Sequence, residues 1–203
     1  MTSASDREGW EGDRIGILGG TFDPPHVGHL RMAAAARDVL GLDRVFFSPA
    51  PRPPHKSDAD TSPYAHRVAM VEAAIAGEER VSLTTIEESH ATSYTVDLLR
   101  ACRGRTRADL YFIMGADSLA ELPTWRDPAG VAALATLVVF PRGSGVMRAS
   151  IAGDVALVVF EAPVVDVSST EIRARLERGD AAGEGVAPAV ARYLARHRLY
   201  ARA

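Results

Sequence analysis

The chain has 203 residues, of which 47% are hydrophobic and 24% are charged. These values are those of an ordinary soluble globular protein with one main domain, so a chain that is mostly disordered is excluded. The formal net charge is −3, so no overall basic field favours nucleic acid or an anionic membrane as a partner. A small anionic substrate remains compatible with this charge, because it needs only a local cationic pocket.

The cellular location is expected to be the cytoplasm. The single cysteine, Cys102, cannot close a disulfide within the chain, which weakly favours a reducing compartment. Residues 1–13 lack the apolar core of a signal peptide, and no stretch reaches the roughly 18 apolar residues of a membrane-spanning helix. We expect a flexible tail at residues 1–13 and one folded domain over 14–203. A homo-oligomer stays open, because nothing in the sequence decides the oligomeric state.

Apolar runs of strand length alternate with helical segments along the chain. In order, we expect a strand at 15–18, a helix at 27–40, a strand at 45–47, a helix at 63–76, a strand at 81–86, a helix at 94–101, strands at 110–114, 136–140 and 157–160 with short helices around 123–125, and helices at 169–178 and 188–196. Uniformly apolar strands that alternate with helices are typical of a parallel sheet covered on both faces. The predicted fold class is therefore α/β, a Rossmann-like doubly wound parallel sheet in a single domain.

Several helix ends carry their own signals. Ser62 and Ser93 are expected to be N-caps, Ser168 with Glu171 forms an S-x-x-E capping box, and Gly41 is expected to end the helix before it. Ligands of such folds bind beyond the carboxyl ends of the strands, where the strand order reverses. The loops that follow residues 18, 47, 86, 114 and 167 are therefore the ones to search.

The loop after the first strand, G-G-T-F-D-P-P-H-V-G-H at 19–29, carries the strongest chemical signal. Exposed backbone N–H groups and a helix N-terminus form an anion site. His26 and His29 are three residues apart and so lie on one face of the first helical turn, while Gly28 leaves room for a phosphate. Two imidazoles in this position suit polyphosphate charge that changes during a reaction. Two solvated histidines near a turn are the alternative.

Other motifs for phosphate binding or hydrolysis are absent. The chain has no G-x-x-x-x-G-K-[ST], no G-x-G-x-x-G after a strand, no H-E-x-x-H and no G-x-S-x-G. No third ligand accompanies the two histidines, so a protein metal site is not expected.

Two loops carry candidate residues for binding a nucleotide, one for a phosphate and one for a ribose. The only lysine of the chain, Lys56, follows two prolines and a histidine in P-P-H-K at 53–56, where a stiff loop would present it to phosphate. Asp117 comes just after a strand, like the acids that accept ribose hydroxyl hydrogens in dinucleotide folds. A solvated lysine and a helix N-cap are the respective alternatives.

Three further residues suit a flat heteroaromatic ring and a carboxylate. Trp125, on a proline-bounded loop, could stack on a heteroaromatic ring or could simply cap the core. Tyr94 and Thr95 lie at a helix start, where backbone N–H groups could receive a carboxylate or where the pair could act only as a cap.

The segment V-S-S-T-E-I-R at 167–173 puts three hydroxyl groups at one helix start. One hydroxyl suffices for a cap. Ser168, Ser169 and Thr170, together with Arg173 in the first turn, therefore form a candidate phosphate-binding group, with capping alone as the alternative.

Together these motifs resemble the nucleotidyltransferases of the HxGH type and, among them, the bacterial nicotinate-nucleotide adenylyltransferase family. The resemblance runs from Ile15 to Tyr200 and rests on G-G-T-F-D-P-P-H-V-G-H, P-P-H-K, S-Y-T-x-D, G-A-D-x-L, L-P-x-W, V-S-S-T-E-I-R and the tail R-L-Y at 198–200. The pantetheine-phosphate members generally have threonine at the position of His26. Leu98 and Val167 depart from the family pattern, which usually has threonine and isoleucine there.

The resemblance implies transfer of the adenylyl group of ATP to nicotinate mononucleotide, with Mg²⁺ carried by ATP rather than by a protein cage. It implies that His26 and His29 are catalytic. The ATP-binding residues that it implies are Gly19, Gly20, Thr21, Phe22, Ser168, Ser169, Thr170 and Arg173. The residues implied for nicotinate mononucleotide are Lys56, Tyr94, Thr95, Asp117, Trp125 and Arg126. The same chemistry on nicotinamide mononucleotide or another phosphorylated acceptor, and a non-catalytic nucleotide sensor, are the alternatives.

Overall fold

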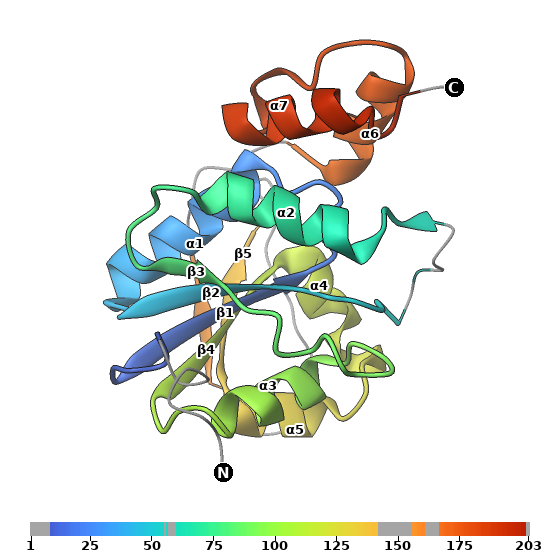
Figure 1. Ribbon diagram of the computed structural model, residues 1–203. Coiled ribbons are helices and arrows are strands. Elements are labelled where there is room, and N and C mark those ends of the chain that lie inside the picture. Colours follow the sequence, from blue (N-terminus) through green and yellow to red (C-terminus); the bar gives the residue numbers. More distant parts are fainter. Residues whose placement is uncertain (1–8, 55, 57–59, 142–155, 161–166, 202–203) are drawn as a thin grey trace.

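The computed structural model describes residues 9–54, 56, 60–141, 156–160 and 167–201. In this part of the chain, six parallel strands form one sheet in the order β3-β2-β1-β4-β5-β6 (Figure 1). The strands are β1 (Arg14–Gly20), β2 (Arg44–Pro49), β3 (Val81–Leu83), β4 (Asp109–Gly115), β5 (Thr136–Phe140) and β6 (Leu157–Val159). The predicted doubly wound parallel sheet is confirmed.

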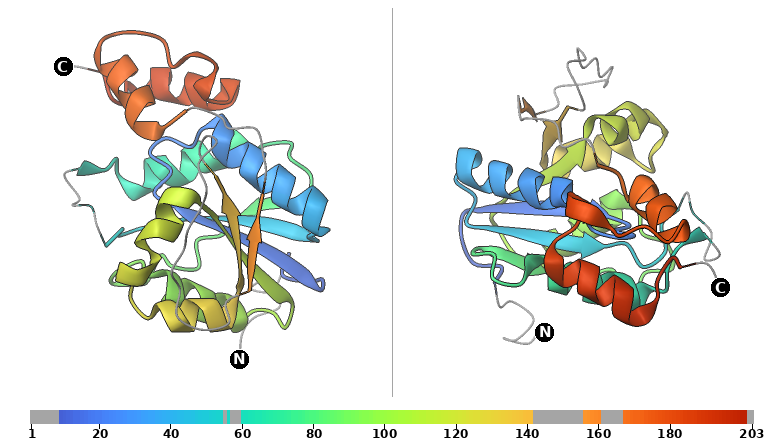
Figure 2. Two further views of the ribbon diagram at one scale, coloured as in Figure 1. Left: turned by 180° about the vertical axis from the view of Figure 1, so that it is seen from behind. Right: turned by 90° about the horizontal axis from the view of Figure 1, so that it is seen from above.

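Helices cover both faces of this sheet. They are α1 (Val27–Leu40), α2 (Tyr64–Ile75), α3 (Thr95–Arg103), α4 (Ala116–Glu121), α5 (Pro128–Leu134), α6 (Ser169–Glu177) and α7 (Pro188–His197), with short 3-10 helices η3 (Leu122–Thr124) and η4 (Gly183–Gly185). Helices α1 and α2 lie on one face, whereas α3 and α5 lie on the other (Figures 1 and 2). The C-terminal helices α6 and α7 lie beyond α2, on its side away from the sheet, and α7 packs against it (Figure 1).

Each central strand divides its side chains between two hydrophobic cores, because successive side chains point to opposite faces of a sheet. In β1, Ile15 and Ile17 join the core under α3 and α5, whereas Leu18 joins the core under α1 and α2. In β4, Phe112 and Ile113 divide in the same way. This burial on both sides is the physical reason why the strands read as uniformly apolar runs.

Two of the predicted helix ends are confirmed. Gly41 follows α1 in the left-handed conformation, with φ 61° and ψ 43°, a region that glycine enters without a steric penalty. Ser168 is the N-cap of α6, and its hydroxyl group accepts from the backbone N–H of Glu171 at 3.2 Å.

The predicted N-caps Ser62 and Ser93 are wrong. Pro63 and Tyr94 hold the N-cap positions of α2 and α3, and neither makes a capping hydrogen bond through its side chain. The two serines serve loop contacts instead, since the Ser93 hydroxyl group accepts from the backbone N–H of Arg52 at 3.1 Å. Tertiary contacts therefore override the local capping preference.

Two other stretches differ from the expected elements. Strand β3 ends at Leu83, and the backbone then turns, with Glu88 N–H donating to the carbonyl of Thr85 at 2.9 Å. Within the stretch expected as a tail, Trp10 is only 7% exposed and stacks on Phe46 with ring centroids 4.0 Å apart. Contacts with the core therefore begin before β1. Every helix in the described part of the chain is too short or too polar to cross a membrane.

Candidate active site

A cavity of about 620 Å³ opens at the carboxyl ends of β1 and β4. The strand order reverses between these two neighbours, so the connections that follow them leave towards opposite faces and a crevice remains. Its walls come from the loops after β1 and β2, the start of α3, and the segment from α4 to Trp125. This is the edge of the sheet where the sequence predicts a ligand.

Most of the predicted site residues come together in this cavity. Those that line it are Gly19, Gly20, Thr21, His26, His29, Tyr94, Thr95, Asp117, Trp125 and Arg126. Those that do not line it are Phe22, Lys56, Ser168, Ser169, Thr170 and Arg173. The second group lies around the loop from β1 to α1 rather than on the cavity wall.

The two histidines of the loop stack against each other. Their ring centroids are 3.7 Å apart with an interplanar angle of 29°. The Nδ1 atom of His29 accepts the backbone N–H of His26 at 3.1 Å, so a neutral His29 carries its proton on Nε2. The stacking and this hydrogen bond fix both imidazoles relative to the start of α1.

The start of α1 carries no acidic side chain that would repel a bound anion. His26 is the N-cap residue of this helix. A helix N-terminus carries a partial positive charge and backbone N–H groups without helical partners. Gly28 is buried and lines the cavity, which fits the predicted approach of a phosphate to the backbone.

Phe22 supports the loop between β1 and α1 from the side of the hydrophobic core. Its side chain is 2% exposed and meets the ring of His29 edge-on, with centroids 4.9 Å apart. Its backbone has φ 52°, a region that is unfavourable for a residue with a bulky side chain. The peptide bond between Asp23 and Pro24 is cis. Phe22 therefore shapes the histidine loop from the core and does not touch the cavity.

A buried arginine joins the loops after β1 and β2. Arg67 on α2 is 1% exposed. Its guanidinium group donates to four backbone carbonyls, those of Thr21 at 2.9 Å, Ala50 at 2.7 Å, Pro51 at 3.2 Å and Ser62 at 3.0 Å. A planar group with five donors can satisfy several carbonyls that local structure leaves unpaired. Arg67 thus sets the distance between two walls of the cavity.

The predicted phosphate-binding group at the start of α6 lies against the same loop. The Ser169 hydroxyl group donates to the carbonyl of Pro24 at 2.9 Å, and Arg173 donates to the carbonyl of Asp23 at 2.8 Å. Ser168 is engaged in its capping box with Glu171. These groups therefore meet the chain two or three residues before His26.

Lys56 lies at the surface, on the loop that follows β2, with its amine turned towards the histidine loop. Partial burial and the nearby guanidinium group of Arg173 lower the pKa of its amine. Its predicted neighbour in the motif, His55, lies outside the described residues. Lys56 and Arg173 thus form a cationic side of the histidine loop.

The opposite end of the cavity is aromatic. Trp125 packs edge-on against Phe112, with centroids 6.2 Å apart at 82°. The guanidinium group of Arg126 lies over the ring of Tyr94 at 4.8 Å from its centroid, and it contacts Asp97 at 3.4 Å. Aromatic faces beside the N-terminus of a helix suit a flat ring that bears a carboxylate.

Asp117 lies in the first turn of α4, just after β4. Gly115 holds the N-cap position of this helix, so Asp117 is not the cap. Its side chain is exposed and lines the cavity, in keeping with the predicted contact to a ribose.

Glu87 is a cavity residue that the sequence analysis did not assign. Its carboxyl group is 3% exposed and accepts the hydroxyl group of Ser48 at 3.1 Å. Burial raises its pKa to about 7, the charge of Asp97 adds to this, and the bond from Ser48 opposes it. The signal was its position directly after Ile86, at the end of an expected strand. Arg67 gave no signal, because a charged residue on a predicted helix is ordinarily read as solvated.

Among the described residues, no group of three or more His, Cys, Asp or Glu side chains could hold a metal ion.

Comparison with known proteins identifies the family. A family model described as cytidylyltransferase-like matches residues 17–175, so the chain belongs to the cytidylyltransferase-like family of nucleotidyltransferases. Relatives named "Probable nicotinate-nucleotide adenylyltransferase" include one from Thermus thermophilus, 41% identical over 92% of this chain and 99% of its own, and one from Bacillus pumilus, 39% identical over 92% and 98%. The chain falls in the same branch of that family as these relatives, and the resemblance noted in the sequence is confirmed.

Solved structures share the fold. The Plasmodium falciparum nicotinic acid mononucleotide adenylyltransferase, solved in complex with NaAD, has a TM-score of 0.79 at 19% identity, over 93% of this chain and 98% of its own. The same enzyme in complex with APC has a TM-score of 0.76 at 17% identity, over the same shares of the two chains.

The buried carboxyl group of Glu87 predicts a pH dependence of stability. Because its pKa is about 7 in the folded chain and 4.5 without burial, the folded state binds more protons between these values. This contribution to stability is complete below about pH 4.5 and is lost as the pH rises to about 7, by on the order of 3 kcal/mol. Urea unfolding across this range should therefore show that Glu87→Gln loses less stability than the parent.

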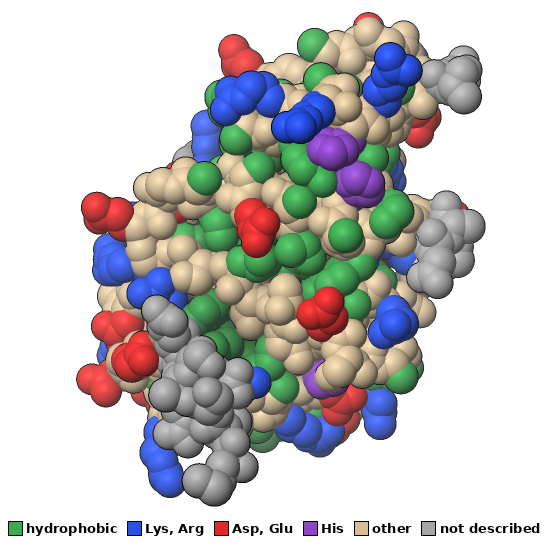
Figure 3. Space-filling model, in the orientation of Figure 1, with side chains coloured by type: hydrophobic (Ala, Val, Ile, Leu, Met, Phe, Trp, Pro, Cys, Tyr) green, Lys and Arg blue, Asp and Glu red, His purple; other side chains and the backbone are tan. Residues whose placement is uncertain are grey.

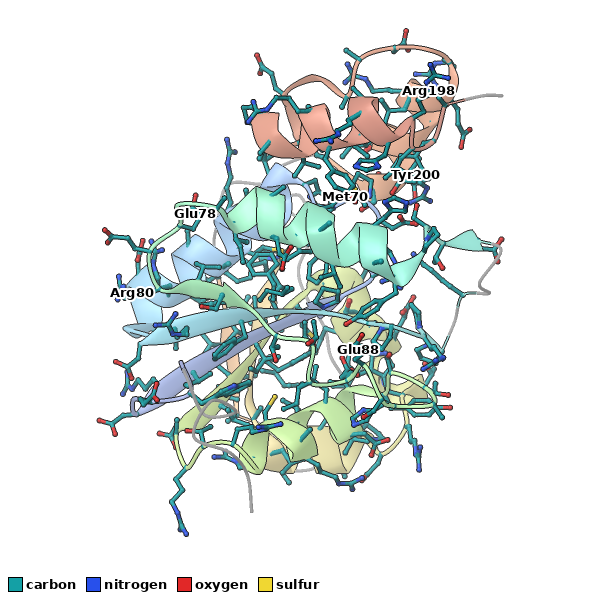
Figure 4. The ribbon with its side chains drawn as sticks, viewed as in Figure 1. Met70, Glu78, Arg80, Glu88, Arg198 and Tyr200 are labelled. Carbon is teal, nitrogen blue, oxygen red and sulfur yellow. The ribbon has the colours of Figure 1, made fainter. Side chains whose placement is uncertain are left out.

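Glu88→Gln is the matched control, because Glu88 is the exposed neighbour of Glu87 (Figure 4). Its free energy of unfolding should change with pH as that of the parent does. If the free energy of unfolding of Glu87→Gln changes in the same way, Glu87 does not titrate as the structure requires.

Proposed function

We propose that this chain transfers the adenylyl group of ATP to nicotinate mononucleotide, giving deamido-NAD and pyrophosphate. The observation that carries the proposal is the stacked pair His26 and His29 at the N-terminus of α1, in the cavity where the strand order reverses. The names of the relatives support the choice of both substrates, and so does the NaAD bound to the Plasmodium falciparum enzyme.

The reaction needs no protein nucleophile. An oxygen of the mononucleotide phosphate attacks the α-phosphorus of ATP, and the bond from that phosphorus to the β-bridging oxygen breaks. Pyrophosphate carries away the electron pair of that bond. Catalysis then consists of positioning the two phosphates in line and stabilising the charge that develops on their oxygens.

The histidine loop supplies this stabilisation. Because Nδ1 of His29 accepts a backbone N–H, the proton on Nε2 can be donated to a phosphate oxygen. His26 and the first N–H groups of α1 would contact the same triphosphate, with Gly19, Gly20 and Thr21 along the adjacent wall. Such preorganised donors act most strongly in a site that excludes water.

The departing phosphates would lie towards α6. Arg173 uses two of its N–H groups on Asp23 and Thr170, and a guanidinium group has five, so donors remain for the β- and γ-phosphates. Ser168, Ser169 and Thr170 would add hydroxyl groups, and Lys56 a further positive charge beside the acceptor phosphate. We expect Phe22 to act through the shape of the loop rather than through direct contact.

The acceptor would occupy the aromatic end of the cavity. Trp125 would stack on the pyridine ring, while the backbone N–H groups at Thr95 and Arg126 would receive its carboxylate. Tyr94 would form the wall beside it, and Asp117 would bind a ribose hydroxyl group. An acidic pyridine suits this end because it faces the N-terminus of α3.

We expect Mg²⁺ to enter with ATP, held by phosphate oxygens and water. Bound there, the ion neutralises charge on the triphosphate. The cytoplasm, which holds ATP, is where we expect the reaction to run.

An acceptor panel tests the proposed function. Pyrophosphate release from ATP should be fast with nicotinate mononucleotide and slow with nicotinamide mononucleotide, because only the acid carries the carboxylate. Equal or faster release with the amide would favour the sister activity. ATP binding without pyrophosphate release from either acceptor would indicate a nucleotide sensor instead.

His29→Ala should reduce kcat by roughly 100-fold or more, since one preorganised donor to the transition state is lost. Steady-state pyrophosphate release measures this. His197→Ala is the control, because His197 is an exposed histidine on α7 and should leave kcat unchanged. A folded His29→Ala variant with the kcat of the parent would exclude the catalytic role.

Trp125→Ala should raise KM for nicotinate mononucleotide about tenfold and change KM for ATP little, because stacking on one ring is worth about 1–3 kcal/mol. Initial rates with each substrate varied separately give both constants. Trp125→Phe, which keeps an aromatic face, should recover most of the loss. An unchanged KM for the mononucleotide in Trp125→Ala would rule out the stacking.

A further inference from the structure

The C-terminal end of the chain reaches back to the histidine loop. The hydroxyl group of Tyr200 donates to Oδ1 of Asp23, across 177 positions of sequence. Tyr200 follows α7 and lies on the side of the C-terminal helices that faces α2 (Figure 4). The tail R-L-Y at 198–200, which the sequence analysis singled out without a role, thus ends at the loop that carries His26.

Two more C-terminal side chains meet the same short stretch. Arg173 donates to the carbonyl of Asp23 at 2.8 Å, and Ser169 donates to that of Pro24 at 2.9 Å. We call Ser169, Arg173 and Tyr200 the C-terminal strap. All three of its contacts fall on the two residues that precede Pro25 and His26.

Of the three strap residues, only Tyr200 contacts the side-chain carboxylate of Asp23. Asp23 is 2% exposed, and its second carboxylate oxygen accepts the backbone N–H of Ser62 at 3.1 Å. A buried carboxylate is costly unless hydrogen bonds replace its water. Burial and the bond to Asp23 raise the pKa of Tyr200, so its hydroxyl group stays protonated and able to donate at neutral pH.

The loop itself needs outside support. Phe22, the residue before Asp23, has the unfavourable φ of 52°, and such a backbone persists only where its surroundings hold it. Arg67 holds the loop at Thr21, and the stacked imidazoles sit at its end. Between these two points, the C-terminal strap holds the loop at Asp23 and Pro24.

We propose that Tyr200 is a positioning residue for the reaction, and that the C-terminal strap holds His26 and His29 in their productive geometry through Asp23. The proposal rests on the proposed function, because it assigns these imidazoles to the triphosphate. The C-terminal helices then support the active site from outside the cavity, which neither they nor Tyr200 line.

Tyr200→Phe tests this, because it removes the hydroxyl group and leaves the ring. We expect kcat to fall about tenfold, as small misplacements of reacting groups do, with KM for nicotinate mononucleotide unchanged because the aromatic end is untouched. In ¹⁵N NMR spectra of the full chain, the imidazole resonances of His26 and His29 should shift as well.

Tyr193→Phe is the matched control in the same C-terminal helices. Its hydroxyl group pairs with His66 at 2.9 Å. Histidine side chains lie beside Lys and Arg side chains on this face of the molecule (Figure 3). Tyr193→Phe should leave kcat and the resonances of His26 and His29 unchanged.

The proposal requires both effects of Tyr200→Phe, the fall in kcat and the shift of the imidazole resonances. A kcat within about twofold of the parent, or unmoved imidazole resonances, overturns the proposal. A parent that releases no pyrophosphate refutes the proposed function, and the NMR comparison then decides alone whether the strap holds the loop.

Discussion

The loop between β1 and α1 has a backbone that local preference does not favour, and buried polar side chains from other segments hold it. Phe22 occupies a left-handed conformation, which costs free energy in a bulky residue. The guanidinium group of Arg67 and the carboxylate of Asp23 fix the loop on either side of Phe22. Because these groups are buried, each is strongly held only while all its partners are present. The position of the two imidazoles depends on this arrangement.

The position of this loop follows from the strand order of the sheet. The strand order reverses at β1 and β4, so the loop opens onto a crevice that the start of α3 and the segment around Trp125 close from the other side. Cationic groups gather at the histidine end, and aromatic rings gather at the far end. On the proposed function, the triphosphate would lie on the histidine side of the cavity and the pyridine ring at its aromatic end.

The sequence predicts the architecture well because the architecture rests on local patterns. Uniformly apolar strands indicate two-sided burial, and the G-G turn with HxGH marks a helix start that binds anions. The prediction that Ser62 and Ser93 are N-caps was wrong. The backbone N–H of Ser62 bonds to Asp23, and the hydroxyl group of Ser93 accepts from Arg52. Such partners lie some 40 positions away, and no local pattern reports them.

The supporting residues of the site could not be predicted for the same reason. Arg67 and Glu87 look like surface charges in the sequence, and only the fold buries them. Tyr200 reaches its partner across nearly the whole chain. Single-sequence reasoning finds candidate binding groups, since their chemistry is visible, and most of them line the cavity. It misses the groups that hold those in place.

The most direct measurement is a crystal structure of this chain with deamido-NAD bound. We predict that the phosphate of the adenylate half lies within hydrogen-bonding distance of the His26 and His29 rings, roughly 2.7–3.2 Å between heavy atoms, and that the pyridine ring lies on Trp125. A dinucleotide bound outside this cavity, or one whose phosphates face away from both imidazoles, would contradict the account.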